Sequence, residues 1–165
     1  MAITLSIIWY SRTNGSRQLA QAAYDAACEV SDNLSVRLIP AEDAGADDLL
    51  GADGYLFACP ENLAAIAGEM KAFFDRTYYD VLGQIEGRPY AAIICAGSDG
   101  TNARQQLERI CTGWRLKRIA DTPIINVEAQ TKEEILAPKI ISDDGLCKAR
   151  ELGATLAAGL EMGIF

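Results

Sequence analysis

A segment rich in hydroxyl and amide side chains follows the first apolar run of the sequence, and its composition suits the binding of an anion. The segment consists of Ser11, Arg12, Thr13, Asn14, Gly15 and Ser16. A helical pattern begins directly after it, so the unpaired N–H groups and the positive dipole end of a helix N-terminus add to the side-chain donors. This combination predicts a phosphate-binding loop, and a helix cap rich in serine and threonine is the open alternative.

The loop differs from the common nucleotide-binding motifs. It has neither the G-x-x-x-x-G-K-[ST] pattern of a P-loop nor the G-x-G-x-x-G pattern of a dinucleotide-binding fold. The apolar run before it does not end in acidic residues, which argues against a metal-dependent phosphoacceptor domain of the receiver type. The expected ligand is therefore a phosphate group held by hydroxyl and backbone N–H groups.

Two further turns follow apolar runs and contain residues that suit contact with a ligand. The first comprises Cys59, Pro60, Glu61, Asn62 and Leu63. Its proline and asparagine are expected to form the turn. The second comprises Ala96, Gly97, Ser98, Asp99, Gly100 and Thr101. Its two glycines let the backbone approach a flat ligand closely. Each turn alone is also compatible with an ordinary strand-to-helix connection.

The absence of histidine from the 165 residues excludes several kinds of chemistry. Ser-His-Asp and Cys-His nucleophilic catalysis and histidine-ligated zinc all require an imidazole. The five cysteines are scattered and include no C-x-x-C pair. This pattern favours buried thiols in a reducing compartment over a disulfide framework or a structural metal site.

The excess of acidic over basic residues argues against binding to nucleic acid. Fifteen basic and 23 acidic residues give a net charge of −8, and no long run of Lys and Arg offers the basic face that nucleic-acid binding needs. No apolar stretch approaches the roughly 18 residues that span a bilayer. The N-terminal segment also lacks a basic leader and a small-residue cleavage site. We therefore expect a cytoplasmic protein that binds neither nucleic acid nor membrane.

Five short runs of apolar and β-branched residues must position the three turns. They lie at residues 3–9, 34–39, 54–59, 90–96 and 123–128. Several are apolar at consecutive positions, which is typical of parallel strands covered on both faces. A chain of 165 residues predicts a single domain over residues 1–165.

Amphipathic helical patterns separate or follow these runs. They are predicted at residues 19–30, 66–77, 103–114 and 146–160, with a short helix around residues 47–50. Thr131 and Glu134 have the spacing of a capping box, and Pro138 limits that helix to about two turns. The alternation predicts a three-layer, doubly wound α/β fold, in which ligands bind beyond the carboxyl ends of the strands.

Taken together, the three turns resemble those of the flavodoxin-like superfamily. The pattern S-x-T-[GN]-x-[ST] in the first turn is similar to an FMN-phosphate loop. Residues 59–76 resemble the proline turn and following helix of the NAD(P)H-dependent FMN and quinone reductases, most specifically at Met70-Lys71-Ala72-Phe73-Phe74-Asp75-Arg76. The resemblance implies a five-stranded parallel sheet in the order 2-1-3-4-5, with FMN across the tips of strands one, three and four.

The resemblance also implies binding roles for the residues of the three turns. The FMN phosphate would be held by Ser11, Thr13, Asn14, Gly15 and Ser16. Arg12 flanks this loop and could add charge to it, and a solvated arginine at the start of a helix is the open alternative. One side of the isoalloxazine would meet Pro60, Glu61, Asn62 and Leu63, and the other would meet Gly97, Ser98, Asp99 and Gly100. Asn14 stands where flavodoxins usually have glycine, and asparagine tolerates the left-handed backbone conformation.

Three functions remain open from the sequence. The leading one is an FMN-dependent oxidoreductase, with NAD(P)H as co-substrate and a quinone or similar small molecule as electron acceptor, assembled as a homodimer or tetramer. The second is a flavodoxin-type electron carrier without substrate turnover. Neither the second nor the third turn has the flavin-stacking aromatic residue typical of such carriers. The third is a flavodoxin-like domain that binds no flavin.

Overall fold

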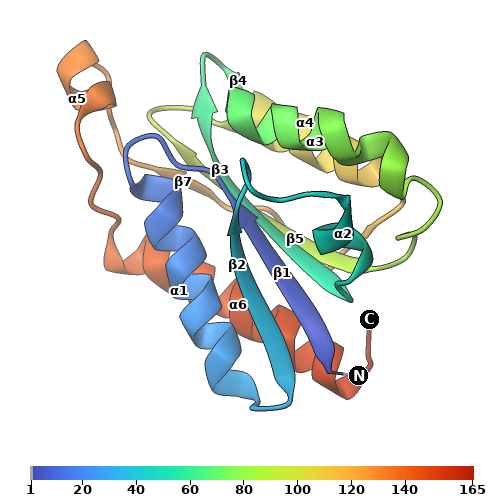
Figure 1. Ribbon diagram of the computed structural model, residues 1–165. Helices are drawn as coiled ribbons and strands as arrows, with labels where there is room; N and C mark the ends of the chain where they lie inside the picture. Colours follow the sequence, from blue (N-terminus) through green and yellow to red (C-terminus); the bar gives the residue numbers. More distant parts are fainter. Residues whose placement is uncertain (1) are drawn as a thin grey trace.

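The protein is built around one parallel sheet with helices on both faces (Figure 1). The computed structural model describes residues 2–165. The strand order is β2-β1-β3-β5-β6, and β7 also pairs with β5. The strands of this sheet are β1 Ile3–Trp9, β2 Leu34–Pro40, β3 Gly54–Asn62, β5 Pro89–Ala96, β6 Lys117–Arg118 and β7 Ile124–Asn126. The predicted three-layer, doubly wound fold is therefore confirmed.

The central strands are buried on both faces, as their continuous apolar runs predict. Every residue of β5 is buried, and successive residues of this strand point to opposite sides of the sheet. Ile94 belongs to one hydrophobic cluster, whereas its neighbours Ile93 and Cys95 belong to the other. The sheet thus separates two cores, each of which a layer of helices must cover.

Helices α1 and α6 cover one core, and α2, α3 and α4 cover the other (Figure 1). Their bounds are α1 Gly15–Val30, α2 Ala46–Leu50, α3 Gly68–Val81, α4 Thr101–Gly113 and α6 Asp143–Met162. All five helices were predicted from the sequence, but α3 begins at Gly68 because Ile66, expected at its start, lies in a short strand. Within the described residues 2–165, none of the helices is long and apolar enough to cross a membrane.

The edge of the sheet next to β5 differs from the prediction of one strand at residues 123–128. Two short strands, β6 and β7, pair with different parts of β5. Strand β7 ends early because Glu128 has a positive φ of 54°, which turns the chain away from the sheet. The predicted fifth strand therefore supplies only three residues to the ladder.

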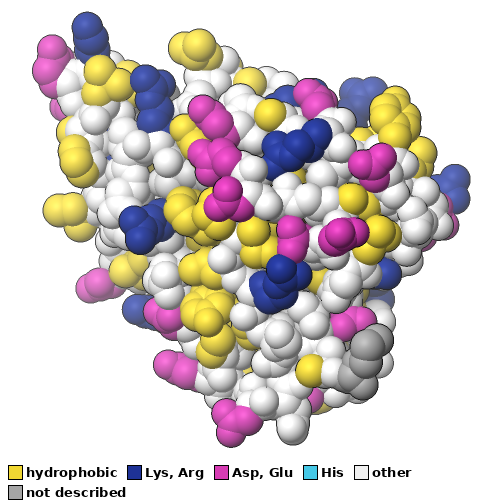
Figure 2. Space-filling view, viewed as in Figure 1, with side chains coloured by type: hydrophobic (Ala, Val, Ile, Leu, Met, Phe, Trp, Pro, Cys, Tyr) yellow, Lys and Arg dark blue, Asp and Glu magenta, His cyan; other side chains and the backbone are white. Residues whose placement is uncertain are grey.

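Helix α5, Lys132–Leu136, follows β7 and stands beyond the edge of the sheet (Figure 1). The predicted capping box is confirmed, because the Thr131 hydroxyl accepts a hydrogen bond from the Glu134 N–H at 3.2 Å. None of the residues of α5 is buried. Figure 2 shows hydrophobic side chains exposed over this helix, where Ile135 and Leu136 are both about half exposed.

Residues 59–63 were predicted to form a turn, but they belong to a β-hairpin. Residues 59–62 are the end of its first strand, and Leu63 begins its tip. Strand β3 continues to Asn62 and pairs antiparallel with β4, Ala65–Ile66. Pro60 and Asn62 therefore lie in the strand, so the expectation that they form the turn is wrong. Leu63 and Ala64 form it instead, with positive φ values of 50° and 62°.

Side chains of α4 hold this hairpin in place. The Asn102 amide donates a hydrogen bond to the Ala64 carbonyl, and the Gln106 side chain accepts one from the Ile66 N–H at 2.9 Å. Neither Leu nor Ala favours the left-handed conformation, which costs on the order of 1–3 kcal/mol at each such residue. These tertiary contacts thus support a turn that local sequence preference does not predict.

Candidate functional site

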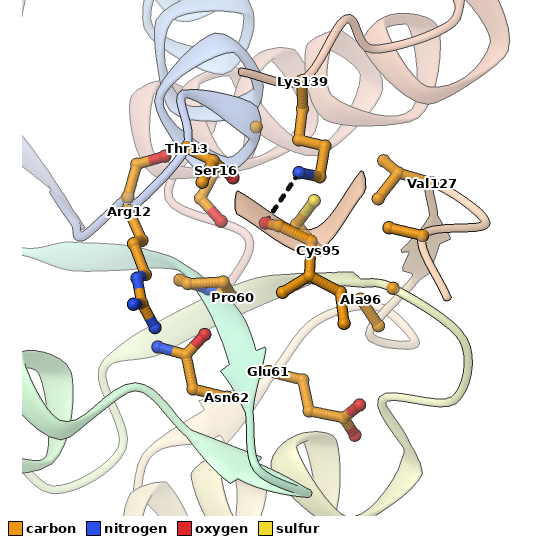
Figure 3. A pocket seen from close by; sticks show the side chains of 15 residues that line it. Arg12, Thr13, Ser16, Pro60, Glu61, Asn62, Cys95, Ala96, Val127 and Lys139 are labelled. Atoms are coloured by element: carbon orange, nitrogen blue, oxygen red, sulfur yellow. Dashed lines mark hydrogen bonds between the residues drawn. The ribbon is translucent and has the colours of Figure 1, made fainter. Parts of the chain in front are cut away.

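A cavity of about 70 Å³ lies at the carboxyl ends of β1, β3 and β5. This volume can hold several water molecules or one small anionic group. Fifteen residues line it, from the first turn, the β3–β4 hairpin, the end of β5 and the segment after β7 (Figure 3). Within the described residues 2–165, none of the lining residues is aromatic. The parallel topology therefore brings the three predicted turns to one edge of the sheet.

The start of α1 forms the upper wall of this cavity in Figure 3. Asn14 adopts the left-handed conformation at the N-cap, with φ 70°, and its side chain makes no capping hydrogen bond. The first turn of the helix also contains no acidic residue. Asn14 itself does not line the cavity, so it contributes backbone geometry here. The first N–H groups of α1 consequently have no capping side chain to accept their hydrogen bonds.

Ser16 is the most informative residue of the first turn. It is only 1% exposed, and its hydroxyl has no hydrogen-bond partner within residues 2–165. A buried polar group left without a partner costs about 1–3 kcal/mol. Because Ser16 lines the cavity, a ligand with oxygen acceptors would remove this cost.

Gly15 allows α1 to approach the end of β5 closely. A Cβ atom added to this glycine would lie 2.8 Å from the Cys95 Sγ atom, closer than real Cβ atoms come. The thiol of Cys95 therefore forms part of the cavity floor beneath the helix N-terminus. Burial raises the pKa of this thiol to about 11, and the nearby ammonium of Lys139 partly opposes the rise. Cys95 is thus protonated at neutral pH.

The β3–β4 hairpin provides the opposite wall. Pro60, Glu61 and Asn62 line the cavity, as predicted. The Glu61 carboxylate accepts a hydrogen bond from the Gly100 N–H at 2.7 Å, which joins the hairpin to the third turn. Leu63, in contrast, is fully exposed at the tip of the hairpin and does not line the cavity.

Only part of the third turn reaches the cavity. Gly97 lines it, whereas Ser98, Asp99 and Gly100 do not. The Asp99 carboxylate accepts hydrogen bonds from the backbone N–H and the hydroxyl of Thr101, which lower its pKa. Asp99 therefore organises the start of α4 in this structure.

Arg12 also lines the cavity, but its guanidinium does not lie where it could contact a phosphate group bound at the N-terminus of α1. Figure 3 shows its guanidinium extending toward Asn62, away from Ser16. The side chain is exposed. Of the first turn, Ser11, Arg12, Thr13, Gly15 and Ser16 thus line the cavity together.

The sequence patterns did not identify the last wall. Residues 128–141, which we call the strap, run from the end of β7 past α5 and back to α1. Ala129, Ile135 and Lys139 of the strap line the cavity, beside Val127. The capping box predicted a helix in this segment, but no local signal indicated that the segment folds over the first turn.

The three-layer fold and the cavity at its carboxyl edge define a flavodoxin-like α/β protein. The sequence pattern of the family described as "NADPH-dependent FMN reductase" matches residues 15–129. The chain therefore belongs to the NADPH-dependent FMN reductase family, an FMN-binding branch of the flavodoxin-like proteins.

Flavodoxins are among the proteins that resemble this chain. A flavodoxin of Aquifex aeolicus (strain VF5) is 30% identical over 94 residues, which are 57% of this chain and 50% of that protein. The matched region thus spans about half the length of this curated relative. A flavodoxin from the domain Archaea superposes with a TM-score of 0.79 at 16% identity, covering 96% of this chain and 99% of the other. A WrbA-like flavodoxin from Agrobacterium tumefaciens gives 0.69 at 14% identity, covering 98% and 99%.

The residues around the start of α1 fit the phosphate group of FMN. The unpaired hydroxyl of Ser16 can donate to a phosphate oxygen, and the uncapped helix N-terminus offers further donors. Gly15 leaves no Cβ to block the approach of α1 to β5. The cavity can therefore accept one anionic group at this position.

Proposed function

We propose that this protein is an FMN-dependent oxidoreductase that uses NADH or NADPH to reduce a quinone or a similar small-molecule acceptor. The observation that carries the proposal is the buried, unpaired hydroxyl of Ser16 at the open N-terminus of α1. Membership of an NADPH-dependent FMN reductase family supports the nucleotide as the reductant. The homodimer or tetramer expected from the sequence remains part of this proposal.

In this proposal the chain binds and orients the cofactor. Ser11, Thr13 and Ser16, with the backbone of Gly15, hold the phosphate. Pro60, Glu61, Asn62 and Gly97 border the rest of the site. FMN, when bound, supplies the hydride and electron transfer. No acid or base side chain is required, which is consistent with a sequence that contains no histidine.

A nicotinamide needs access to one face of the flavin. Within the described residues, the cavity lining contains no aromatic side chain that could stack on the ring from either wall. The tip of the hairpin is also free of aromatic residues, since Leu63 and Ala64 form it. This composition supports an enzyme that leaves a flavin face open to its substrate.

A flavodoxin-type electron carrier is the second candidate. The similarity to the Aquifex aeolicus flavodoxin favours it, as does the net charge of −8, because acidic carriers are steered toward basic partners. Such a carrier would bind FMN in the same cavity but would not turn over a nicotinamide nucleotide. The two candidates therefore agree on the cofactor and differ in turnover.

Binding and turnover can be measured on the same purified protein. We expect FMN to bind more tightly than FAD, because the phosphate loop is short and the chain has no dinucleotide motif. Quenching of flavin fluorescence on titration measures both affinities. A steady-state assay then follows oxidation of NADH and of NADPH by the FMN-loaded protein, with a quinone as acceptor.

The outcomes separate the candidates. FMN binding with nucleotide oxidation supports the enzyme. FMN binding without oxidation of either nucleotide supports the carrier. Binding of FAD alone, or of no flavin, would overturn both.

A further inference from the structure

The strap places one lysine directly against the first turn. The backbone N–H of Lys139 donates to the Thr13 carbonyl at 2.7 Å, and its carbonyl accepts from the Gln18 side chain at 2.7 Å. Gln18 also accepts a hydrogen bond from the Ile141 N–H at 3.3 Å. These bonds attach the end of the strap to both the loop and the first turns of α1.

The side chain of Lys139 packs at the start of this helix. Its Cβ atom lies 3.5 Å from the position that a Cβ atom on Gly15 would occupy. Figure 3 shows the ammonium group pointing into the cavity, near Cys95. The positive charge of Lys139 and the unpaired Ser16 hydroxyl therefore line the same cavity.

Backbone carbonyls at the end of α5 fix the position of the ammonium. It donates to the carbonyls of Glu134 at 2.7 Å and Ile135 at 3.0 Å, and also to that of Ala137. An ammonium has three N–H donors, so all of them are occupied. The charge is thus positioned in advance, and it can attract an anion without any rearrangement of the strap.

The other charged residues of the cavity do not take this role. Within the described residues, the lining contains three charged side chains, which are Arg12, Glu61 and Lys139. The Arg12 guanidinium extends toward Asn62, and the Glu61 carboxylate is bound to the Gly100 N–H. Among the charged side chains of the lining, Lys139 is therefore the cation that lies beside the Ser16 hydroxyl and the backbone N–H groups at the start of α1.

We propose that Lys139 makes this site select the phosphorylated flavin, FMN, over the uncharged riboflavin. The inference rests on the proposed FMN binding and extends it. Hydroxyl and backbone N–H donors can bind neutral as well as charged oxygen acceptors, whereas a fixed positive charge favours only the anion. The match to the reductase family ends at residue 129, so Lys139 lies outside the matched part of the chain.

The test compares the affinities for FMN and riboflavin in the wild-type protein and in Lys139→Met. Methionine is similar in length to the lysine stem but carries no charge. We expect FMN affinity to fall by about tenfold or more, with little change for riboflavin, and the salt dependence of FMN binding to weaken. Lys139→Arg keeps the charge and should retain most of the preference for FMN.

Two control variants separate the charge from other effects. Lys132→Met makes the same change in net charge on an exposed residue of α5 that does not line the cavity. Thr131→Ala removes the α5 N-cap and loosens the strap while it keeps Lys139. Lys132→Met should leave the ratio of FMN to riboflavin affinity unchanged. Thr131→Ala should lower the ratio less than Lys139→Met does, because the positive charge remains while the α5 carbonyls that fix it are loosened. Circular dichroism checks that each variant is folded.

Three results would overturn the inference. They are equal loss of FMN and riboflavin binding in Lys139→Met, an unchanged FMN preference in that variant, or the same effect from Lys132→Met. If the wild-type protein binds no FMN, the proposed function itself fails. That outcome is distinct because it is seen before any variant is compared.

Discussion

Ser16 and Thr13 show how single residues of the first turn prepare the site. Ser16 is buried with an unpaired hydroxyl, and Thr13 anchors the strap through its carbonyl while its side chain lines the cavity. Asn14 supports both by adopting the left-handed conformation that begins α1. A buried hydroxyl without a partner lowers the stability of the protein, and an anion bound beside it would remove that cost.

Replacing both hydroxyls tests this role. Thr13→Ala with Ser16→Ala should weaken FMN binding by about two orders of magnitude or more, since each hydrogen bond to a charged group contributes roughly 1.5–3 kcal/mol. The free energy of unfolding without ligand should not fall, because Ser16 has no partner to lose. Flavin fluorescence and urea unfolding measure the two effects. Unchanged FMN affinity in a folded variant would place the site elsewhere.

At the scale of elements, the approach of α1 to α6 depends on a glycine. A Cβ atom on Gly153 of α6 would lie 2.1 Å from the Ala23 carbonyl oxygen of α1. The obstacle is backbone, which cannot move aside as the end of a flexible side chain can. The position of α1, and with it that of the first turn, is therefore coupled to this helix contact.

The variant Gly153→Ala should lower the free energy of unfolding by about 1–3 kcal/mol or more through overpacking. Urea denaturation measures the change. The matched control is Gly68→Ala at the start of α3, where an added Cβ meets nothing within 4 Å. That control should be neutral or stabilising by up to about 1 kcal/mol, because alanine restricts the unfolded chain. Equal stability of the two variants would contradict the proposed close packing.

At the scale of the whole molecule, the two cores exclude water from ionisable groups. Burial raises the pKa of Cys59 to about 12 and that of Cys95 to about 11, from an ordinary value of 9.0. Burial likewise raises the pKa of Cys111. The folded protein therefore keeps these thiols protonated at pH values where the unfolded chain ionises them.

Stability should consequently fall on the alkaline side. Below about pH 9 the thiols are protonated in both states, so they contribute no pH dependence. Above it the unfolded state binds fewer protons, and each thiol lowers the free energy of unfolding by up to about 1.4 kcal/mol per pH unit. The loss continues until the folded-state pKa is reached. Urea unfolding at about pH 8 and about pH 10 tests this.

Exposed cysteines provide the control for that measurement. Cys28 and Cys147 are exposed, so the double variant Cys28→Ser with Cys147→Ser should keep the alkaline dependence of the wild type. A free energy of unfolding that stays constant between the two pH values would show that burial does not hold the core thiols protonated.

Local patterns in the sequence predicted the four strands β1, β2, β3 and β5 and the helices, but not β4 or the division of the last edge into β6 and β7. Continuous apolar runs identified the buried strands, and a 3.6-residue period identified α1, α3, α4 and α6, because both depend on which side of an element faces the core. The hydroxyl-rich segment before α1 predicts a phosphate-binding loop or a helix cap, since helix N-terminal donors are a local property. Parallel topology then implied that the three turns meet.

Tertiary structure alone decided the hairpin and the strap. Leu63 and Ala64 adopt left-handed conformations that their own preferences disfavour, and side chains of α4 stabilise them. Lys139 reaches the cavity through backbone bonds to Thr13 and Gln18, which lie more than a hundred residues earlier in the chain. Such contacts join segments far apart in sequence, so no local period or propensity records them.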